Sequence, residues 1–419
     1  MIILATALTG CGTAVTSTAP TAPERKTNMI KTLVFNFDGT GDEPSDVKKS
    51  RKDKSISNIY KLHLLLGGGT PDVTTPDGAV QRSFYHRGIG TYGDWFRRKE
   101  NEAVAPLAED VRCVLDAAHR ELHWNHEKGD RVAVFGFSRG AALARKFVSE
   151  ALKANRSIEI AFLGVFDTVR ETGGWREIFR SVRTDKETTP EHLGEHGTLD
   201  PHVRQAVHIV SLDERRRTFR PTLINKDSCD PDDLDCTDRI LEVWFPGIHT
   251  DIGGSHPDDG LGDLALAFMI KNFKKAMGDG DAIRITPGDR ASVEALLNEL
   301  REKDPAQYKD FEADDIVIQP RVDGTLHRNK WTSAWIESGF RHPVSRTVCV
   351  KDNDHCSLDD YPLVHHNVKK RFNLDLDPAY RPAALRGVEF KLYVANGKHS
   401  KPIQGINGLR EVANPAPLE

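Results

Sequence analysis

Ser138 stands at the centre of a G-x-S-x-G pattern, residues 136–140 (GFSRG). An apolar run at 131–135 (RVAVF) precedes the pattern, and a segment rich in small residues at 141–152 follows it. A turn this sharp between strand and helix strains the serine backbone and requires glycine at the flanking positions. It also exposes the serine Oγ and aims the helix N-terminus at a developing oxyanion. We therefore predict that Ser138 is a nucleophile, with an ordinary tight turn as the alternative.

A nucleophilic serine needs a general base, and the base needs a carboxylate that orients it. When such residues follow buried strands of a parallel sheet, one chain order is serine, then aspartate, then histidine. Asp167 follows the apolar run 158–166, and His249 follows the run 240–245. The sequence thus predicts a triad of Ser138, Asp167 and His249. For Asp167 the alternative is a turn or capping role, and for His249 a structural loop histidine.

Other histidines downstream of Ser138 compete with His249 as the base. They are His355, His365 and His366. None directly follows so clear a buried strand, so His365 ranks second to His249. Asp251, two residues after His249, is expected to support the loop or the imidazole, and its alternative role is to cap the Gly-Gly turn at 253–254.

An oxyanion hole requires N–H donors from the residue after the nucleophile and from the loop after an earlier strand. Arg139 supplies the first. The loop at 38–41 (DGTG) offers Gly39 and Thr40 for the second, with Asp38 as a supporting residue. A plain glycine turn is the alternative for this loop.

Two other chemistries use overlapping residues. Residues 36–40 (NFDGT) resemble the DxDGT motif of haloacid-dehalogenase-type phosphatases, but Asn36 stands where that motif has its nucleophilic aspartate. An amide cannot replace that nucleophile. The second alternative is a metal site, for which the ligands would be His249, Asp251, His256 and Asp258. A tight turn explains the same loop, so no metal or other cofactor is predicted.

The elements that must position these residues alternate between strand and helix. Buried strands are predicted at 32–37, 131–135, 158–166, 207–212 and 240–245, and helices at 55–66, 103–123, 141–152 and 292–303. The segment 388–394 alternates like an exposed strand. This order predicts an α/β-hydrolase-like fold, with a mostly parallel sheet, helices on both faces and a C-terminal extension. Functional residues are then expected at the carboxyl ends of the strands.

Composition excludes several classes. The 419 residues carry 58 Lys+Arg against 62 Asp+Glu, a formal charge of −4, which gives no basic footprint for nucleic acid. No apolar run approaches the roughly 18 residues of a membrane-spanning helix. The six cysteines form no CxxC pair, so a structural zinc site is not expected. The pairs 229/236 and 349/356 could each form a disulfide, but free thiols are predicted.

Three regions are expected along the chain: a leader or tether at 1–28, a catalytic domain at 29–275 and a C-terminal extension at 276–419. Residues 8–11 (LTGC) look like a lipobox in which Cys11 is lipidated, although no basic residue precedes the apolar start. If the lipobox is genuine, the protein is a periplasmic or outer-membrane lipoprotein. Otherwise Met29 is the start of the domain, and the protein is cytoplasmic before secretion.

Several segments together resemble an α/β-hydrolase family of uncharacterised proteins that includes type VI secretion phospholipase effectors. The segments are 35–41 (FNFDGTG), 85–91 (YHRGIGT), 136–141 (GFSRGA), 162–169 (FLGVFDTV), 213–217 (DERRR) and 244–254 (WFPGIHTDIGG). They come in the family's order and cover about residues 31–275. The family usually has tryptophan where this chain has Phe166, and often a third glycine where it has Ser255.

The resemblance implies a triad of Ser138, Asp167 and His249, and a two-step acyl transfer on an ester, with a membrane phospholipid as the expected substrate. The alternatives are a small-ester hydrolase, or a metal-dependent or non-catalytic member of the same fold. The resemblance also implies contact with a membrane surface and an immunity protein as a partner. A basic amphipathic helix after Asp167 would suit a lid, with Trp175, Ile178, Phe179 and Val182 on one face. A core-facing helix with a solvated basic face is the preferred interpretation of this segment, and the lid is the alternative. Residues 95–99 (WFRRK) are a weaker lid candidate.

Overall fold

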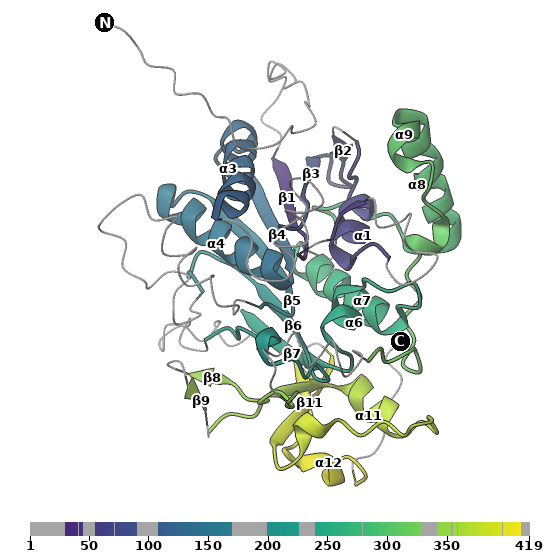
Figure 1. The fold of residues 1–419 in the computed structure, drawn as a ribbon. Coiled ribbons are helices and arrows are strands. Elements are labelled where there is room, and N and C mark those ends of the chain that lie inside the picture. Colours follow the sequence, from purple (N-terminus) through teal and green to yellow (C-terminus); the bar gives the residue numbers. More distant parts are fainter. Residues whose placement is uncertain are drawn as a thin grey trace, which may run out of the picture.

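We analysed the protein as a computed structural model. It describes residues 30–40, 42–44, 55–70, 72–89, 108–169, 199–225, 239–278, 280–328, 342–352, 355–357, 359–395 and 397–411. The proposed lipobox and lid, residues 95–99, and Cys229 and Cys236 lie outside these ranges. Figure 1 shows one continuous sheet running through the molecule, with helices on both sides.

The sheet is mostly parallel, as predicted. Its strand order is β12-β11-β10-β7-β6-β5-β4-β1-β3-β2, with β13 also paired to β11. The neighbours from β3 to β11 all run parallel, and only β2, β12 and β13 are antiparallel. The parallel strands are β1 (Lys31–Phe37), β3 (Val80–His86), β4 (Arg131–Phe137), β5 (Glu159–Phe166), β6 (Ala206–Ser211), β7 (Ile240–Phe245), β10 (Leu363–His365) and β11 (Glu389–Ala395). The antiparallel strands are β2 (Val73–Thr74), β12 (Lys398–His399) and β13 (Ile403–Gln404).

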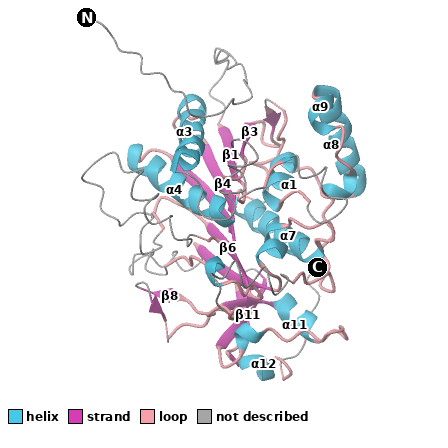
Figure 2. Cartoon of the chain, in the orientation of Figure 1, coloured by secondary structure: helices cyan, strands magenta, loops and turns pink. Residues whose placement is uncertain are grey.

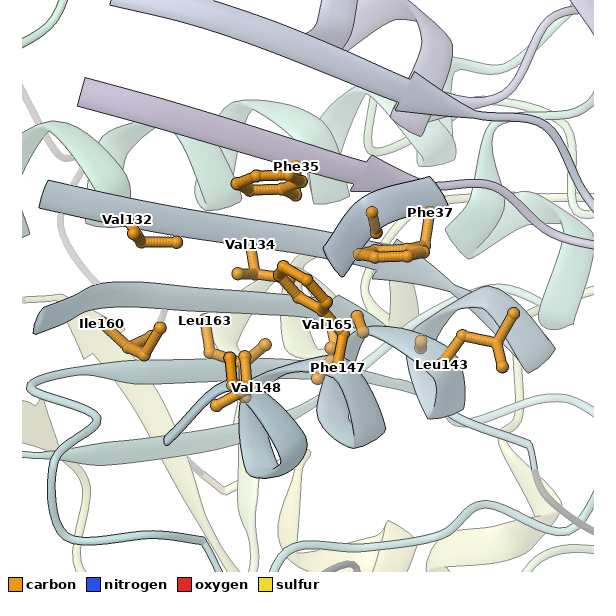
Figure 3. Close-up of a cluster of buried hydrophobic side chains, with 14 of the residues drawn as sticks. Phe35, Phe37, Val132, Val134, Leu143, Phe147, Val148, Ile160, Leu163 and Val165 are labelled. Atoms are coloured by element: carbon orange, nitrogen blue, oxygen red, sulfur yellow. The ribbon is translucent and has the colours of Figure 1, made fainter. Parts of the chain in front are cut away.

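Alternate side chains along the strands pack against different helices. One face of β1, β4 and β5 packs on α3 (Ala108–Asn125) and α4 (Ser138–Ala154), where Phe35, Val134 and Phe147 meet (Figure 3). The other face packs on α1 (Asn58–Leu65) and α7 (Gly260–Ala276). Strands covered on both faces are apolar throughout, which explains why the sequence shows unbroken apolar runs there.

The predicted C-terminal extension adds strands to the same sheet. β10 pairs with β7, and β11 pairs with β10, both in parallel. Figure 2 shows β11 among the magenta strands at the lower end of the sheet. A separate apolar cluster joins these strands to α11 (His366–Phe372) and to the short helix α12 (Gly405–Gly408). On the far side of α1 pack α8 (Arg290–Lys303) and α9 (Pro305–Tyr308). The division of the chain at residue 275 stays a prediction.

The prediction of free thiols is wrong: none of the cysteines in the described part of the chain is a free thiol, and Cys113, Cys349 and Cys356 are all disulfide-bonded. The short strands β8 (Lys351–Asp352) and β9 (His355–Cys356) form an antiparallel hairpin that brings Cys349 and Cys356 together with their Cα atoms 5.4 Å apart. That separation lies in the range that a disulfide spans, and the two residues are bonded.

Most strands and helices lie where the sequence places them, with ends that shift by a few residues. The sequence pattern did not predict β3, β10, the long helix α7 or the short helix α6 (His249–Gly253). β3 and β10 lack an unbroken apolar run, and α7 begins within a glycine- and aspartate-rich segment that resembles a loop. β11 is more buried than an exposed strand, because β10 and β12 lie on either side of it.

Candidate active site

The turn from β4 into α4 holds Ser138 in a conformation that few residues other than glycine adopt. Its φ is +57°, in the left-handed region, and it is the first residue of α4. The turn depends on its glycines. A Cβ at Gly136 would lie 2.6 Å from the Cα of Ala141, and one at Gly140 would lie 2.2 Å from the carbonyl oxygen of Asp38. Such strain persists only where the surrounding structure enforces it, and it often marks a functional site.

His249 lies directly beside this serine. It begins α6, just after β7, and is 3% exposed. Its Nε2 is 2.8 Å from the Oγ of Ser138, and its Nδ1 is 2.5 Å from Oδ2 of Asp167. Because a carboxylate only accepts hydrogen bonds, the proton of a neutral imidazole lies on Nδ1. Nε2 is then free to accept the hydroxyl proton of Ser138.

Asp167 follows β5 and is fully buried. Its φ is also positive, +42°, so this turn is strained as well. The Oδ1 atom accepts the N–H of Ser211 at 3.0 Å. Arg346 donates to both carboxylate oxygens, at 2.5 Å to Oδ1 and 2.9 Å to Oδ2. The sequence analysis did not identify Arg346, since it lies in a polar segment with no strand or helix pattern.

The protonation states suit a nucleophile with its base. Burial alone would raise the pKa of Asp167, but the charge of Arg346 and the hydrogen bond with His249 lower that pKa well below its usual range. Burial lowers the pKa of His249, and Asp167 only partly opposes this shift. At pH 7 the site therefore holds a charged carboxylate and a neutral imidazole.

Two aromatic rings pack against the imidazole of His249, and a buried ion pair holds its backbone. The ring centroids of Phe137 and Phe219 lie 4.8 Å and 4.9 Å from that of His249. The backbone N–H of His249 donates to Glu214, which is fully buried and paired with Arg216 at 2.9 Å. The motif at 213–217 carried no assigned role in the sequence analysis, so Glu214 and Arg216 are further residues that it missed.

The loop after β1 lies against the start of α4. β1 and β4 are parallel neighbours with Phe37 opposite Gly136, so residues 38–40 and 137–139 leave the sheet side by side. Asp38 holds this loop by accepting hydrogen bonds from the Gly39 N–H at 2.8 Å and from the hydroxyls of Ser57 and Tyr85, each at 2.6 Å. The Oγ1 atom of Thr40 is buried and has no hydrogen-bond partner among the described residues.

Asp251 supports α6 and does not contact the imidazole through any of its described hydrogen bonds. It accepts the N–H of Ile248 at 2.9 Å, at the helix start, and a hydrogen bond from His327 at 2.6 Å. Asp251 therefore supports the start of the helix that carries His249.

One group of described residues could hold a metal ion. Candidate ligand atoms of Asp251, His256 and His327 lie within 4.8 Å of one another. This set differs from the predicted alternative, since His249 is engaged with Ser138, and Asp258 pairs with Arg321 at 3.0 Å. His256 and His327 stack face to face, with centroids 3.7 Å apart. In the structure His256 Nε2 lies 2.8 Å from Thr250 Oγ1, and His327 Nδ1 lies 2.6 Å from Oδ1 of Asp251.

The competing histidines lie elsewhere. His365 is stacked on Phe245 at 4.1 Å, and its Nδ1 accepts the N–H of Asn367 at the start of α11. His366 lies within α11, and His355 lies exposed on β9. Asn36 is buried in β1 and donates to Ser83 and to the Phe84 carbonyl, as a structural strand residue does.

A parallel α/β sheet with a serine, a histidine and an aspartate at the ends of its strands defines the class of the α/β hydrolases. The model of one family within this class, the catalytic domain of Tle1-like phospholipase effectors of the type VI secretion system, matches residues 31–153 and 146–272. The match spans more than half of the chain, so the chain belongs to this family.

Individual relatives are distant. An uncharacterized protein of Saccharomyces cerevisiae is 26% identical over 255 residues, 47% of this chain and 33% of the yeast protein. A crystal structure of an uncharacterized protein from Pseudomonas aeruginosa has a TM-score of 0.36 at 17% identity, over 62% of this chain and 47% of that one. The Tle1 effector bound to the VgrG spike has a TM-score of 0.29 at 21% identity, over 54% and 51%. The matched part of the chain thus spans a third to about half of each of these proteins.

No described helix is both long enough and apolar enough to span a bilayer.

Proposed function

We propose that this protein is a serine hydrolase that cleaves carboxylic esters of membrane phospholipids, with Ser138 as nucleophile, His249 as general base and Asp167 as its orienting carboxylate. The observation that carries the proposal is the continuous hydrogen-bonded chain from Ser138 Oγ through the imidazole to Asp167. Membership in a family of phospholipase effector domains supports the choice of substrate.

The reaction follows from the geometry. His249 Nε2 takes the hydroxyl proton as Ser138 attacks the ester carbonyl, and Asp167 stabilises the imidazolium that forms. The imidazolium then gives its proton to the leaving alcohol. Water, deprotonated by the same imidazole, releases the acyl group from Ser138.

We assign the oxyanion hole to the N–H of Arg139 and to the loop at Gly39 and Thr40. Arg139 directly follows the proposed nucleophile in the first turn of α4, where the helix dipole favours negative charge. Thr40 contributes a buried hydroxyl without a partner, on a loop that packs against the same turn. A donor already desolvated in the free enzyme loses little hydration when an oxyanion forms beside it.

The family also suggests how the enzyme is used. We propose that it is an antibacterial effector of a type VI secretion system. The structure of the Tle1 effector on a VgrG spike supports a VgrG-type protein as its delivery partner. An immunity protein that binds the enzyme remains a prediction.

The first test is hydrolysis of labelled phosphatidylethanolamine and phosphatidylglycerol vesicles, beside a short water-soluble ester. We expect Ser138→Ala to lower phospholipid turnover by about 10⁴-fold or more. Ser157→Ala, which removes an exposed hydroxyl just beyond the far end of α4, is the matched control and should retain full activity.

Each result decides a different part of the proposal. Turnover of the soluble ester alone would make this a small-ester hydrolase. Full phospholipid activity in Ser138→Ala would overturn the triad.

A further inference from the structure

Arg346 is a buried arginine that reaches the triad from outside the stretch that the family model matches. That match ends at residue 272, whereas Arg346 lies in the segment 342–350. Only 7% of the residue is exposed. Its two terminal nitrogens bind one oxygen each of the Asp167 carboxylate, at 2.5 Å and 2.9 Å. A planar guanidinium in this two-point arrangement fixes the plane of the carboxylate as well as its distance.

The same guanidinium also holds the loops on either side of the carboxylate. It donates to the carbonyl oxygen of Ser211 at 2.9 Å and to that of Phe219. Ser211 in turn donates its N–H to Asp167, and the ring of Phe219 packs edge-on against His249. Arg346 thus contacts the acid of the triad directly and the base through one intermediate residue.

We infer that Arg346 is a positioning residue of the active site: it holds the Asp167 carboxylate on the Nδ1 side of His249 and balances its charge, so that the imidazole remains the neutral base that Ser138 requires. The inference rests on the proposed function and extends it, since it assigns part of the catalytic apparatus to the C-terminal extension. An enzyme cut after residue 275 would lack this part.

The charges around the imidazole determine whether loss of the Arg346 charge raises or lowers the pKa of His249. His249 is faced by Asp167 and by Glu214 and Arg216, which pair with each other. Asp167 is faced by Arg346 and His249. Removal of the Arg346 charge leaves the Asp167 carboxylate uncompensated beside the imidazole. An uncompensated carboxylate favours imidazolium, so the pKa of His249 rises and the base is lost at higher pH than in the wild type.

The test compares the pH profiles of kcat/KM for the full-length wild type, Arg346→Gln and Arg346→Lys. We expect Arg346→Gln to lower kcat/KM at pH 7 by about 10²-fold and to move the acid limb up by about one pH unit. Arg346→Lys keeps the charge but cannot donate in the planar two-point geometry. Its acid limb should stay near that of the wild type, while kcat falls by about tenfold.

Arg371→Gln is the matched control. Arg371 is equally buried in the C-terminal extension and binds the backbone carbonyls of Val322 and Gly324, away from the triad. If buried arginines only stabilise the fold, both glutamine variants will lose thermal stability and neither will change the pH profile. We expect a shifted acid limb in Arg346→Gln alone.

Failure of this inference can be distinguished from failure of the proposed function. An inactive Ser138→Ala together with a wild-type pH profile in Arg346→Gln would overturn only the role of Arg346. An active Ser138→Ala would overturn the triad itself. If Arg346→Gln does not fold, Arg346→Lys still decides: wild-type kcat in that variant would contradict the positioning role.

Discussion

The stretch 31–272 and the C-terminal extension contribute to the same site in different ways. In the first, Ser138 and Asp167 directly follow β4 and β5, and His249 follows β7 after the turn at 246–248. In the extension, Arg346 and His327 lie in segments without helix or strand and reach the site only through the tertiary fold. If the proposed roles hold, residues that react are placed by regular elements, whereas residues that hold them in place need not be.

The largest expected difference in kcat/KM is between variants of His249, in the first region, and of His365, in the C-terminal extension. His249→Ala should lower kcat/KM by about 10⁴-fold, because it removes the general base. His365→Ala removes a ring that stacks on Phe245 and caps α11, so it should lower the melting temperature and change kcat by less than about threefold. Steady-state kinetics and thermal unfolding of both variants measure this. If both variants fold and lose activity to a comparable extent, the assignment of His249 rather than His365 as the general base would be contradicted.

A smaller effect is expected at Thr40, within the first region. Thr40→Val keeps the shape but removes the buried hydroxyl that has no partner, and it should lower kcat by about 10²-fold with little change in KM. Thr40→Ser retains the hydroxyl and should stay within about fivefold of the wild type. Equal rates for the valine and serine variants would remove Thr40 from the oxyanion hole and leave only the backbone donors there.

The smallest expected effect concerns the pH dependence of kcat/KM. Since the pKa of His249 is lowered from its usual value of 6.5, the base stays neutral as the pH falls through 6.5. The acid limb of kcat/KM should therefore lie below pH 6.5 in the wild type. The rate at which a fluorophosphonate labels Ser138 should follow the same limb. An acid limb above pH 6.5 would mean that Asp167 acts on the imidazole more strongly than burial and that Arg346 does not balance its charge.

The fold and the three proposed reacting residues could be predicted because their signals are local. An apolar run that ends shortly before Ser138, Asp167 or His249 is visible in a few consecutive residues. Parallel strands bring their carboxyl ends to one edge of a sheet. Arg346 and Glu214 escaped because burial of a charged residue depends on its partner, and Arg346 finds its partner 179 residues away in the chain. The pairing of Cys349 with Cys356 likewise depended on a hairpin that the sequence pattern did not indicate.

The most direct test of the account is covalent labelling of the full-length protein with a fluorophosphonate, followed by mapping of the modified peptide by mass spectrometry. The account predicts one labelled residue, Ser138, and labelling that is abolished in His249→Ala while a chelator leaves it unchanged. Labelling at another residue, or ester hydrolysis that a chelator stops while Ser138 stays unlabelled, would contradict the serine mechanism. The latter result would direct attention to Asp251, His256 and His327.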